Sequence, residues 1–194
     1  ERAASAILWL GYDAPDGLAE AASRASAVAG AGQLRRFQEG LRAAHEGEPA
    51  RQTVLGHSYG SLVVGAAARE PGLADGVVLV GSPGAGVGHA TDLAVGEVWA
   101  MTSLSDPIQW AAVSPRSLAG DVLLGRIVPG GAAAAFLRPE DDLFFGPNPA
   151  GPAFGARTVA SQPDAGHLGY WDEGRPALDA LVRIATGSGD VTPR

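Results

Sequence analysis

Five short apolar runs are separated by segments with helical spacing, and this alternation constrains the fold more than any other feature. The runs cover residues 6–10, 52–55, 76–80, 97–101 and 157–160. Hydrophobicity is continuous along each run rather than alternating, which favours strands covered on both faces, as in parallel sheets. Strands that alternate with helices predict βαβ units, and hence an α/β domain with a mostly parallel sheet.

The segments between the runs carry helical signals. Residues 11–50 are long for one crossover and are predicted to hold two helices, with Leu34, Phe37 and Leu41 on one face. Residues 61–70 are small and apolar, as expected of a helix packed on a sheet, and Pro71-Gly72 ends them. The last predicted helix begins at Pro176 and stops at Gly187, and its apolar stripe is Leu178, Leu181, Val182 and Ala185.

The length of 194 residues suits one compact domain over residues 1–194. The chain opens at Glu1 without a methionine, so we expect an excised or processed part of a longer protein, and the compartment cannot be read. Residues 107–155 form a Gly-, Ala- and Pro-rich insertion. It is either a functional lid or a helical excursion over a sheet edge, and the sequence favours neither.

Composition excludes several classes of function. The net charge is −7, and every basic residue is arginine. The sequence contains no basic cluster, which argues against nucleic acid as a partner. The absence of lysine excludes a Walker P-loop and a Ser–Lys dyad. The absence of cysteine excludes disulfides, thiol catalysis and Cys-ligated zinc, and no apolar run reaches the ~20 residues of a membrane span. The four histidines lack metal-site spacing, so neither metal nor cofactor is expected.

The strongest motif is Gly56-His57-Ser58-Tyr59-Gly60, which follows the strand-like residues 52–55 and precedes the helical residues 61–70. A GxSxG motif at a strand-to-helix junction is typical of a nucleophile elbow, whose strained turn exposes the serine hydroxyl above the sheet. Gly56 and Gly60 are expected to let strand and helix approach each other. The sequence therefore predicts Ser58 as a nucleophile, against the alternative of an ordinary glycine-rich turn.

A serine nucleophile needs a base and an acid, which follow it in the chain order Ser, Asp, His. His167 is the only histidine after the last apolar run and is the predicted base. Asp106 is the first carboxylate after the run at 97–101 and is the predicted acid. Four other aspartates remain alternatives for the acid: Asp92, Asp121, Asp141 and Asp142. We interpret His57 and His89 as structural or pocket-lining.

Two backbone N–H groups are candidates for an oxyanion hole. The Tyr59 N–H lies at the predicted helix N-terminus. The Tyr12 N–H follows the run at 6–10, although a plain turn explains that position nearly as well.

The glycine-rich residues 81–88 fail the GxGxxG pattern because position 89 is histidine, so we expect an active-site wall rather than a nucleotide site. Four aromatic residues fit either an acyl pocket or plain packing: Phe144, Phe145, Tyr170 and Trp171.

Several of these stretches together resemble the α/β-hydrolase superfamily, and more narrowly an actinobacterial α/β-hydrolase family first catalogued as a domain of unknown function and distantly cutinase-like. The resemblance rests on residues 9–15, 56–60, 80–84, 145–149 and 166–167. It implies a Ser–His–Asp hydrolase fold with Ser58 as nucleophile. Strands that usually precede residues 6–10 in this superfamily are missing, so we expect a reduced sheet of about five strands.

The resulting expectation is a serine hydrolase that cleaves carboxylic esters or related acyl compounds through an acyl-enzyme. Two alternatives remain open. The same triad can pass the acyl group to another acceptor, as in an acyltransferase or thioesterase, or the fold can serve as a non-catalytic binding scaffold. The sequence leaves the natural substrate, the acyl chain length and the oligomeric state undetermined.

Overall fold

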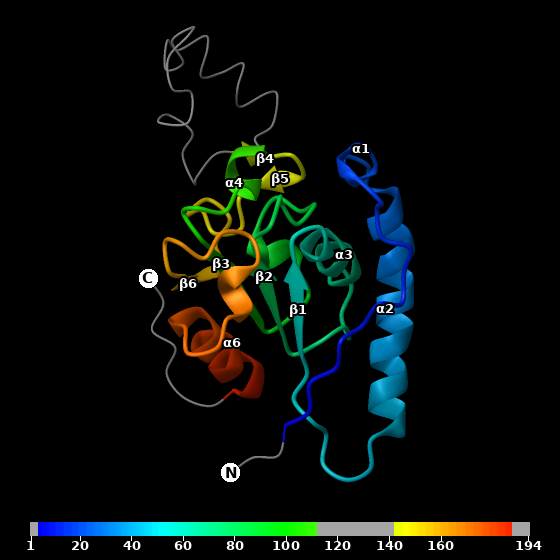
Figure 1. Cartoon of the computed structure of the whole chain (residues 1–194). Helices are drawn as coiled ribbons and strands as arrows, with labels where there is room; N and C mark the ends of the chain where they lie inside the picture. Colours follow the sequence, from blue (N-terminus) through cyan, green and yellow to red (C-terminus); the bar gives the residue numbers. More distant parts are fainter. Residues whose placement is uncertain (1–3, 112–141, 188–194) are drawn as a thin grey trace, which may run out of the picture.

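The computed structural model describes residues 4–111 and 142–187, which form a sheet with helices on both faces (Figure 1). Most of the predicted insertion, residues 112–141, lies outside the described part. The elements run in the order α1 (Leu18–Ala21), α2 (Ala25–Ala44), β1 (Thr53–His57), α3 (Gly60–Ala67), β2 (Gly76–Val80), η1 (Ala90–Asp92), β3 (Glu97–Thr102), α4 (Ile108–Ala111), β4 (Asp142–Leu143), β5 (Gly146–Pro147), β6 (Arg157–Ala160), η3 (Gly169–Trp171) and α6 (Pro176–Thr186).

Four parallel strands form the main sheet in the order β1-β2-β3-β6. Val80 at the end of β2 pairs with His57 on one side and with Met101 on the other, and Met101 pairs with Val159 of β6. The carboxyl ends of all four strands therefore meet at one edge. The predicted α/β class with a mostly parallel sheet is confirmed, with four strands in place of about five.

The missing strand is the apolar run at residues 6–10, which forms no strand in the structure. The segment runs beside α2 in Figure 1, and Trp9 stacks on Tyr12 and contacts Phe37 of that helix. Leu8 and Leu10 are 84% and 77% exposed. The prediction of a buried strand was wrong here because only the aromatic side chains of the segment find partners, and they find them on a helix rather than beside β1.

Side chains of β2 alternate between two apolar layers, which explains why this strand is buried along its whole length. Val77 and Leu79 pack with α2 and α3, whereas Val78 and Val80 pack with α6. Helices therefore cover both faces of the sheet, as the continuous hydrophobicity of this run predicts.

Helix α3 packs directly against α2 and carries the end of the predicted elbow. The Arg35 guanidinium of α2 donates to the carbonyl oxygens of Ala67, Glu70 and Pro71, which follow or end α3. These carbonyls have no partner inside the helix, so the arginine satisfies them and fixes α3 relative to α2. The helix ends at Ala67, a few residues before the predicted end at residue 70.

Helix α6 begins with Pro176 in its first turn and ends at Gly187, whose φ of 60° is left-handed, as predicted. Its buried face differs from the predicted stripe. Ala177, Leu181 and Ile184 are buried, whereas Val182 is 52% exposed. Leu181 of the predicted stripe is buried as expected, whereas the predicted Leu178 and Ala185 are only half-buried.

Strands β4 and β5 form an antiparallel hairpin at the end of the predicted insertion. Phe145, at its turn, donates its N–H to the Pro83 carbonyl and accepts a hydrogen bond from the Gly86 N–H. A Cβ on Gly84 would lie 2.7 Å from the Phe145 carbonyl carbon, so only glycine permits this contact. The hairpin is thereby fixed to the glycine-rich loop after β2.

Candidate active site

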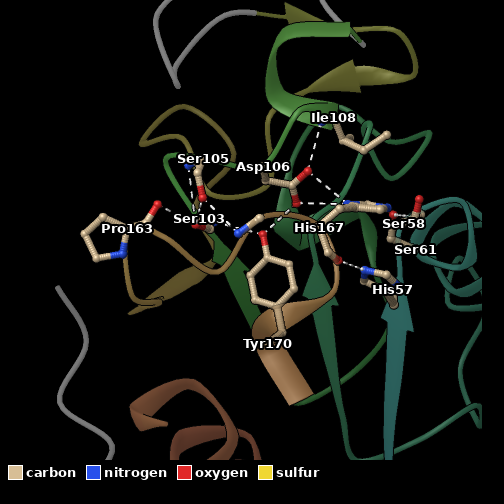
Figure 2. Close-up of polar contacts among 11 residues, drawn as sticks. His57, Ser58, Ser61, Ser103, Ser105, Asp106, Ile108, Pro163, His167 and Tyr170 are labelled. Atoms are coloured by element: carbon tan, nitrogen blue, oxygen red, sulfur yellow. Dashed lines mark hydrogen bonds and ion pairs between the residues drawn. The ribbon is translucent and has the colours of Figure 1, made fainter. Parts of the chain in front are cut away.

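The loops that follow the four strands place the predicted functional residues at the carboxyl edge of the sheet. Ser58 follows β1, Gly81 follows β2, Asp106 follows β3 and His167 follows β6. Figure 2 shows the side chains of Asp106, His167 and Ser58 in a row, with the imidazole between the other two. Residues separated by more than a hundred positions in the chain thus share one site.

Ser58 has the conformation expected of an elbow. Its φ is 53°, and among the described residues it is the only non-glycine residue with a positive φ. Such a conformation is strained for a side-chain-bearing residue and persists only where its surroundings enforce it. A Cβ on Gly56 would lie 2.8 Å from the Gly60 carbonyl oxygen, so Gly56 is required for strand and helix to approach. A Cβ on Gly60 would meet no described atom within 4 Å, so the expectation for that glycine was wrong.

Two buried serines behind the elbow hold the strained turn, and the sequence analysis missed both. Ser61 Oγ donates to the Ser58 carbonyl oxygen at 2.6 Å and lies 2.6 Å from Ser82 Oγ. Ser82 Oγ in turn accepts from the Gly84 N–H at 3.1 Å. Because Ser61 uses its own proton on Ser58, Ser82 is the donor between the two hydroxyls. This chain links the elbow to the loop after β2.

Asp106 and His167 form the hydrogen-bonded pair that the sequence predicts. His167 Nδ1 lies 2.9 Å from Asp106 Oδ1 and 3.0 Å from Oδ2. Oδ1 also accepts from the Ile108 N–H at 2.9 Å. A carboxylate only accepts, so His167 donates from Nδ1 to Asp106.

The Asp106 carboxyl is fully buried. Burial raises the pKa of this carboxyl, but the hydrogen bonds from His167, Tyr170 and the Ile108 N–H outweigh it, so the pKa lies below its ordinary value. Asp106 is therefore held ionised next to the imidazole. This is the charge state that an acid in a Ser–His–Asp arrangement requires.

His57 supports the backbone of His167, in agreement with the structural role predicted for it. Its Nε2 lies 2.8 Å from the His167 carbonyl oxygen, and the two rings are 4.6 Å apart. A carbonyl accepts only, so His57 donates from Nε2. Burial, followed by the proximity of His167, lowers the pKa of His57. The elbow strand is thus tied to the loop that carries His167.

The Ser58 hydroxyl forms no hydrogen bond with any described residue, although Figure 2 shows the His167 ring directed toward it. Hydrogen bonds of this kind are often long before substrate binds. The structure thus brings the His167 imidazole and the Ser58 side chain to the same edge of the sheet.

The side chains of the two residues predicted as oxyanion donors, Tyr59 and Tyr12, both pack near α2. Tyr59 is the N-cap residue of α3, where backbone N–H groups lack intrahelical acceptors. The Tyr59 hydroxyl donates to the Ser23 carbonyl at 2.6 Å and accepts from the Ala27 N–H. The Tyr12 ring packs against Gly30 of α2, and burial together with the nearby Tyr59 raises the pKa of Tyr12. The assignment of both N–H groups remains a prediction.

The alternative acids have other places in the structure. Asp92 accepts from the N–H groups of Gly88 and His89, which caps the short helix η1. Asp142 lies in β4 and is exposed. Asp121 and Asp141 lie outside the described residues. His89 bonds to Thr91 in the same cap, in agreement with a structural role.

The four candidate aromatic residues divide into buried and exposed pairs. Phe145 and Tyr170 are buried, whereas Phe144 and Trp171 are 44% and 39% exposed. Tyr170 donates a hydrogen bond to Asp106 at 2.6 Å, so it is more than packing. Sequence reasoning missed this bond, although the three-residue spacing from His167 was a signal for it.

Comparison with known proteins gives the class to which this fold and site belong. The family model described as alpha/beta hydrolase matches residues 1–115, and the chain belongs to this family. An uncharacterized protein of Mycobacterium bovis is 43% identical over 108 residues, which cover 55% of this chain and 41% of that protein. An uncharacterized protein of Mycobacterium tuberculosis is 33% identical over 199 residues, which cover 95% of this chain and 29% of that protein. The chain thus spans less than half the length of these relatives, and no solved structure matches it.

Within residues 4–111 and 142–187, no helix combines the length and apolar character needed to cross a membrane. Within the same ranges, no three histidine, aspartate or glutamate side chains form a group that could hold a metal ion.

Proposed function

We propose that this member of the alpha/beta hydrolase family is a serine hydrolase that cleaves carboxylic esters or related acyl compounds. The observation that carries the proposal is the hydrogen bond from His167 to the buried Asp106 at the same sheet edge as Ser58, whose backbone is strained. A structural histidine needs no ionised partner, and a plain turn needs no positive φ on a serine. Both features fit a nucleophile activated by a base.

In the proposed reaction, Ser58 Oγ attacks the carbonyl carbon of the substrate while His167 Nε2 accepts the hydroxyl proton. Asp106 holds the imidazole in its Nδ1–H tautomer and stabilises the imidazolium. The Tyr59 N–H, with the Tyr12 N–H as the predicted second donor, binds the oxyanion. The tetrahedral intermediate then collapses, and His167 donates its proton to the leaving alcohol.

The second half of the reaction regenerates the protein. A water molecule attacks the acyl-enzyme carbonyl, His167 accepts a proton from that water, and the ester bond to Ser58 breaks. The proton returns to Ser58 Oγ as the carboxylic acid leaves. No redox step or cofactor takes part in this sequence.

The test compares wild type with Ser58→Ala on esters, thioesters and amides of graded acyl length. We expect turnover of esters by wild type and a loss on the order of 10⁶ in kcat for the variant. Parallel reactions with added alcohols or amines measure acyl transfer. Equal background rates for a folded wild type and Ser58→Ala on every substrate would contradict the proposal and favour a binding scaffold.

A further inference from the structure

The buried carboxylate of Asp106 needs more than one hydrogen-bond donor. Its side chain is 0% exposed, and a buried charge is costly unless hydrogen bonds replace the water it has lost. The single Nδ1–H of His167 is shared between the two carboxylate oxygens, and the Ile108 N–H donates to Oδ1. A donor of its own is therefore expected at Oδ2.

Tyr170 is that donor. Its hydroxyl lies 2.6 Å from Asp106 Oδ2, within the range of a hydrogen bond to a charged oxygen (Figure 2). The Ser103 N–H donates to the same hydroxyl oxygen at 2.8 Å. Since the backbone N–H occupies the acceptor side of the hydroxyl, the phenolic proton is directed at the carboxylate.

The ring of Tyr170 is rigidly held. It is 0% exposed and packs in the apolar layer that α6 forms with the sheet, beside Val80 and Met101. A Cβ on Gly81 would lie 2.7 Å from Asp106 Oδ2 and 3.3 Å from Tyr170 Cε2, so Gly81, directly after β2, packs closely against both side chains.

One short segment carries two of the three groups that bind the carboxylate. His167 lies in the turn before the 3-10 helix η3, and Tyr170 lies within that helix, three residues further on. Nδ1 of the first residue and the hydroxyl of the second both reach Asp106.

We propose that Tyr170 is a positioning residue, and that the segment His167-Leu168-Gly169-Tyr170 acts as one clamp that fixes the Asp106 carboxylate relative to the imidazole. The expected effect of Tyr170 on turnover rests on the proposed function. Its expected effect on the pKa of the Asp106 carboxyl does not depend on that function.

The electrostatics agree with this role. The groups that face Asp106 are His167, His57 and Tyr170, together with the Ile108 N–H. Burial and the neighbouring carboxylate raise the pKa of Tyr170 above its ordinary value, so the phenol keeps its proton. Its hydrogen bond contributes to the lowered pKa of Asp106.

The main test is Tyr170→Phe, which keeps the ring and removes the hydroxyl. We expect kcat to fall about tenfold with KM unchanged, because the hydroxyl acts through Asp106 and does not touch substrate. The acid limb of the pH–rate profile, which reports the Asp106–His167 pair, should move to higher pH. In a ¹³C NMR titration, the Asp106 carboxyl should show a raised pKa whether or not the protein has esterase activity.

Thr53→Val is the matched control. It also removes a partly buried hydroxyl, which donates to the Ala185 carbonyl at 3.2 Å from the opposite end of β1. The control should leave kcat, the acid limb and the Asp106 titration unchanged.

If Tyr170→Phe does not fold, Tyr170→3-fluorotyrosine keeps both ring and hydroxyl, and its more acidic phenol should lower the Asp106 pKa. A folded Tyr170→Phe with unchanged kcat and an unchanged or lower Asp106 pKa would overturn the inference, and so would a fluorotyrosine variant without any shift.

Discussion

Single residues at the sheet edge show which parts of a site can be read from a sequence. Ser58 and His167 were predicted from motif and chain order, and Asp106 from its place after a strand; the structure brings the three together. Ser61 and Ser82 were missed, and so was the hydrogen bond of Tyr170, because these bonds join segments that are distant in the chain. For the two serines no sequence pattern distinguishes such a contact from ordinary packing, whereas the spacing of Tyr170 from His167 was a signal.

At this scale we expect Asp106→Asn to reduce kcat about 10⁴-fold. The amide can donate to Nδ1 and so favours the wrong tautomer of His167, while the shape of the side chain is kept. Steady-state kinetics with an activated ester measure the loss. A variant within tenfold of wild type would show that Asp106 is not the acid.

Gly81→Ala should disturb the Asp106–His167 pair, because Gly81 directly follows β2 and lies against Asp106. The new Cβ would lie 2.7 Å from Asp106 Oδ2, at a φ of 52° that disfavours alanine. We expect a loss of kcat and a decrease of about 1–3 kcal/mol in the free energy of unfolding. Chemical denaturation and the ester assay check both. Gly60→Ala is the comparison within the elbow, since its Cβ would meet no described atom and should cost less stability.

Elements were predicted well where a short apolar run is bounded by turn residues or where caps mark a helix. The strands at 76–80 and 157–160 and the ends of α6 match the prediction because apolar runs, Pro176 and Gly187 encode them locally. The run at 6–10 was mispredicted because its hydrophobic residues are as strand-like as those of β2. Whether such a run pairs with a sheet or packs on a helix depends on neighbours that lie outside the segment.

Helix α6 offers a test of the layer that it forms with the sheet. Leu181 is 2% exposed and packs in the cluster that contains Val78, Val80 and Tyr170. We expect Leu181→Ala to lower the free energy of unfolding by about 2–5 kcal/mol. Val182→Ala, at a 52% exposed position of the same helix, should change it by less than about 1 kcal/mol. Urea denaturation measures the free energy of unfolding of both variants. Equal losses in the two variants would contradict this packing.

For the whole molecule, the α/β class and the meeting of four strand ends follow from the alternation of apolar runs and helices, because parallel strands share one carboxyl edge. The number of strands did not follow, since sheet edges are set by tertiary packing. The matched family and the relatives agree with the class, while the chain spans less than half of those relatives. The reaction therefore remains a proposal about this chain.

The stability of the whole fold should fall on acidification in two stages. The pKa of His57 is lowered in the folded state, so stability is lost as the pH falls below the ordinary histidine value of about 6.5. The pKa of Asp106 is also lowered, so its contribution is present above about pH 4 and is lost as the pH falls through the folded value. Thermal unfolding midpoints measured against pH check both stages. His57→Gln should remove the first stage only, and an unchanged first stage would contradict the role of His57.

The central claim is that Ser58 is a nucleophile activated by His167, and covalent labelling with a fluorophosphonate tests it most directly. Mass spectrometry of the intact protein and of its peptides locates the adduct. The account predicts stoichiometric labelling of wild type on Ser58, no labelling of Ser58→Ala, and labelling slowed by orders of magnitude in His167→Gln. A folded wild type that remains unlabelled, or that carries the adduct on another residue, would contradict the account.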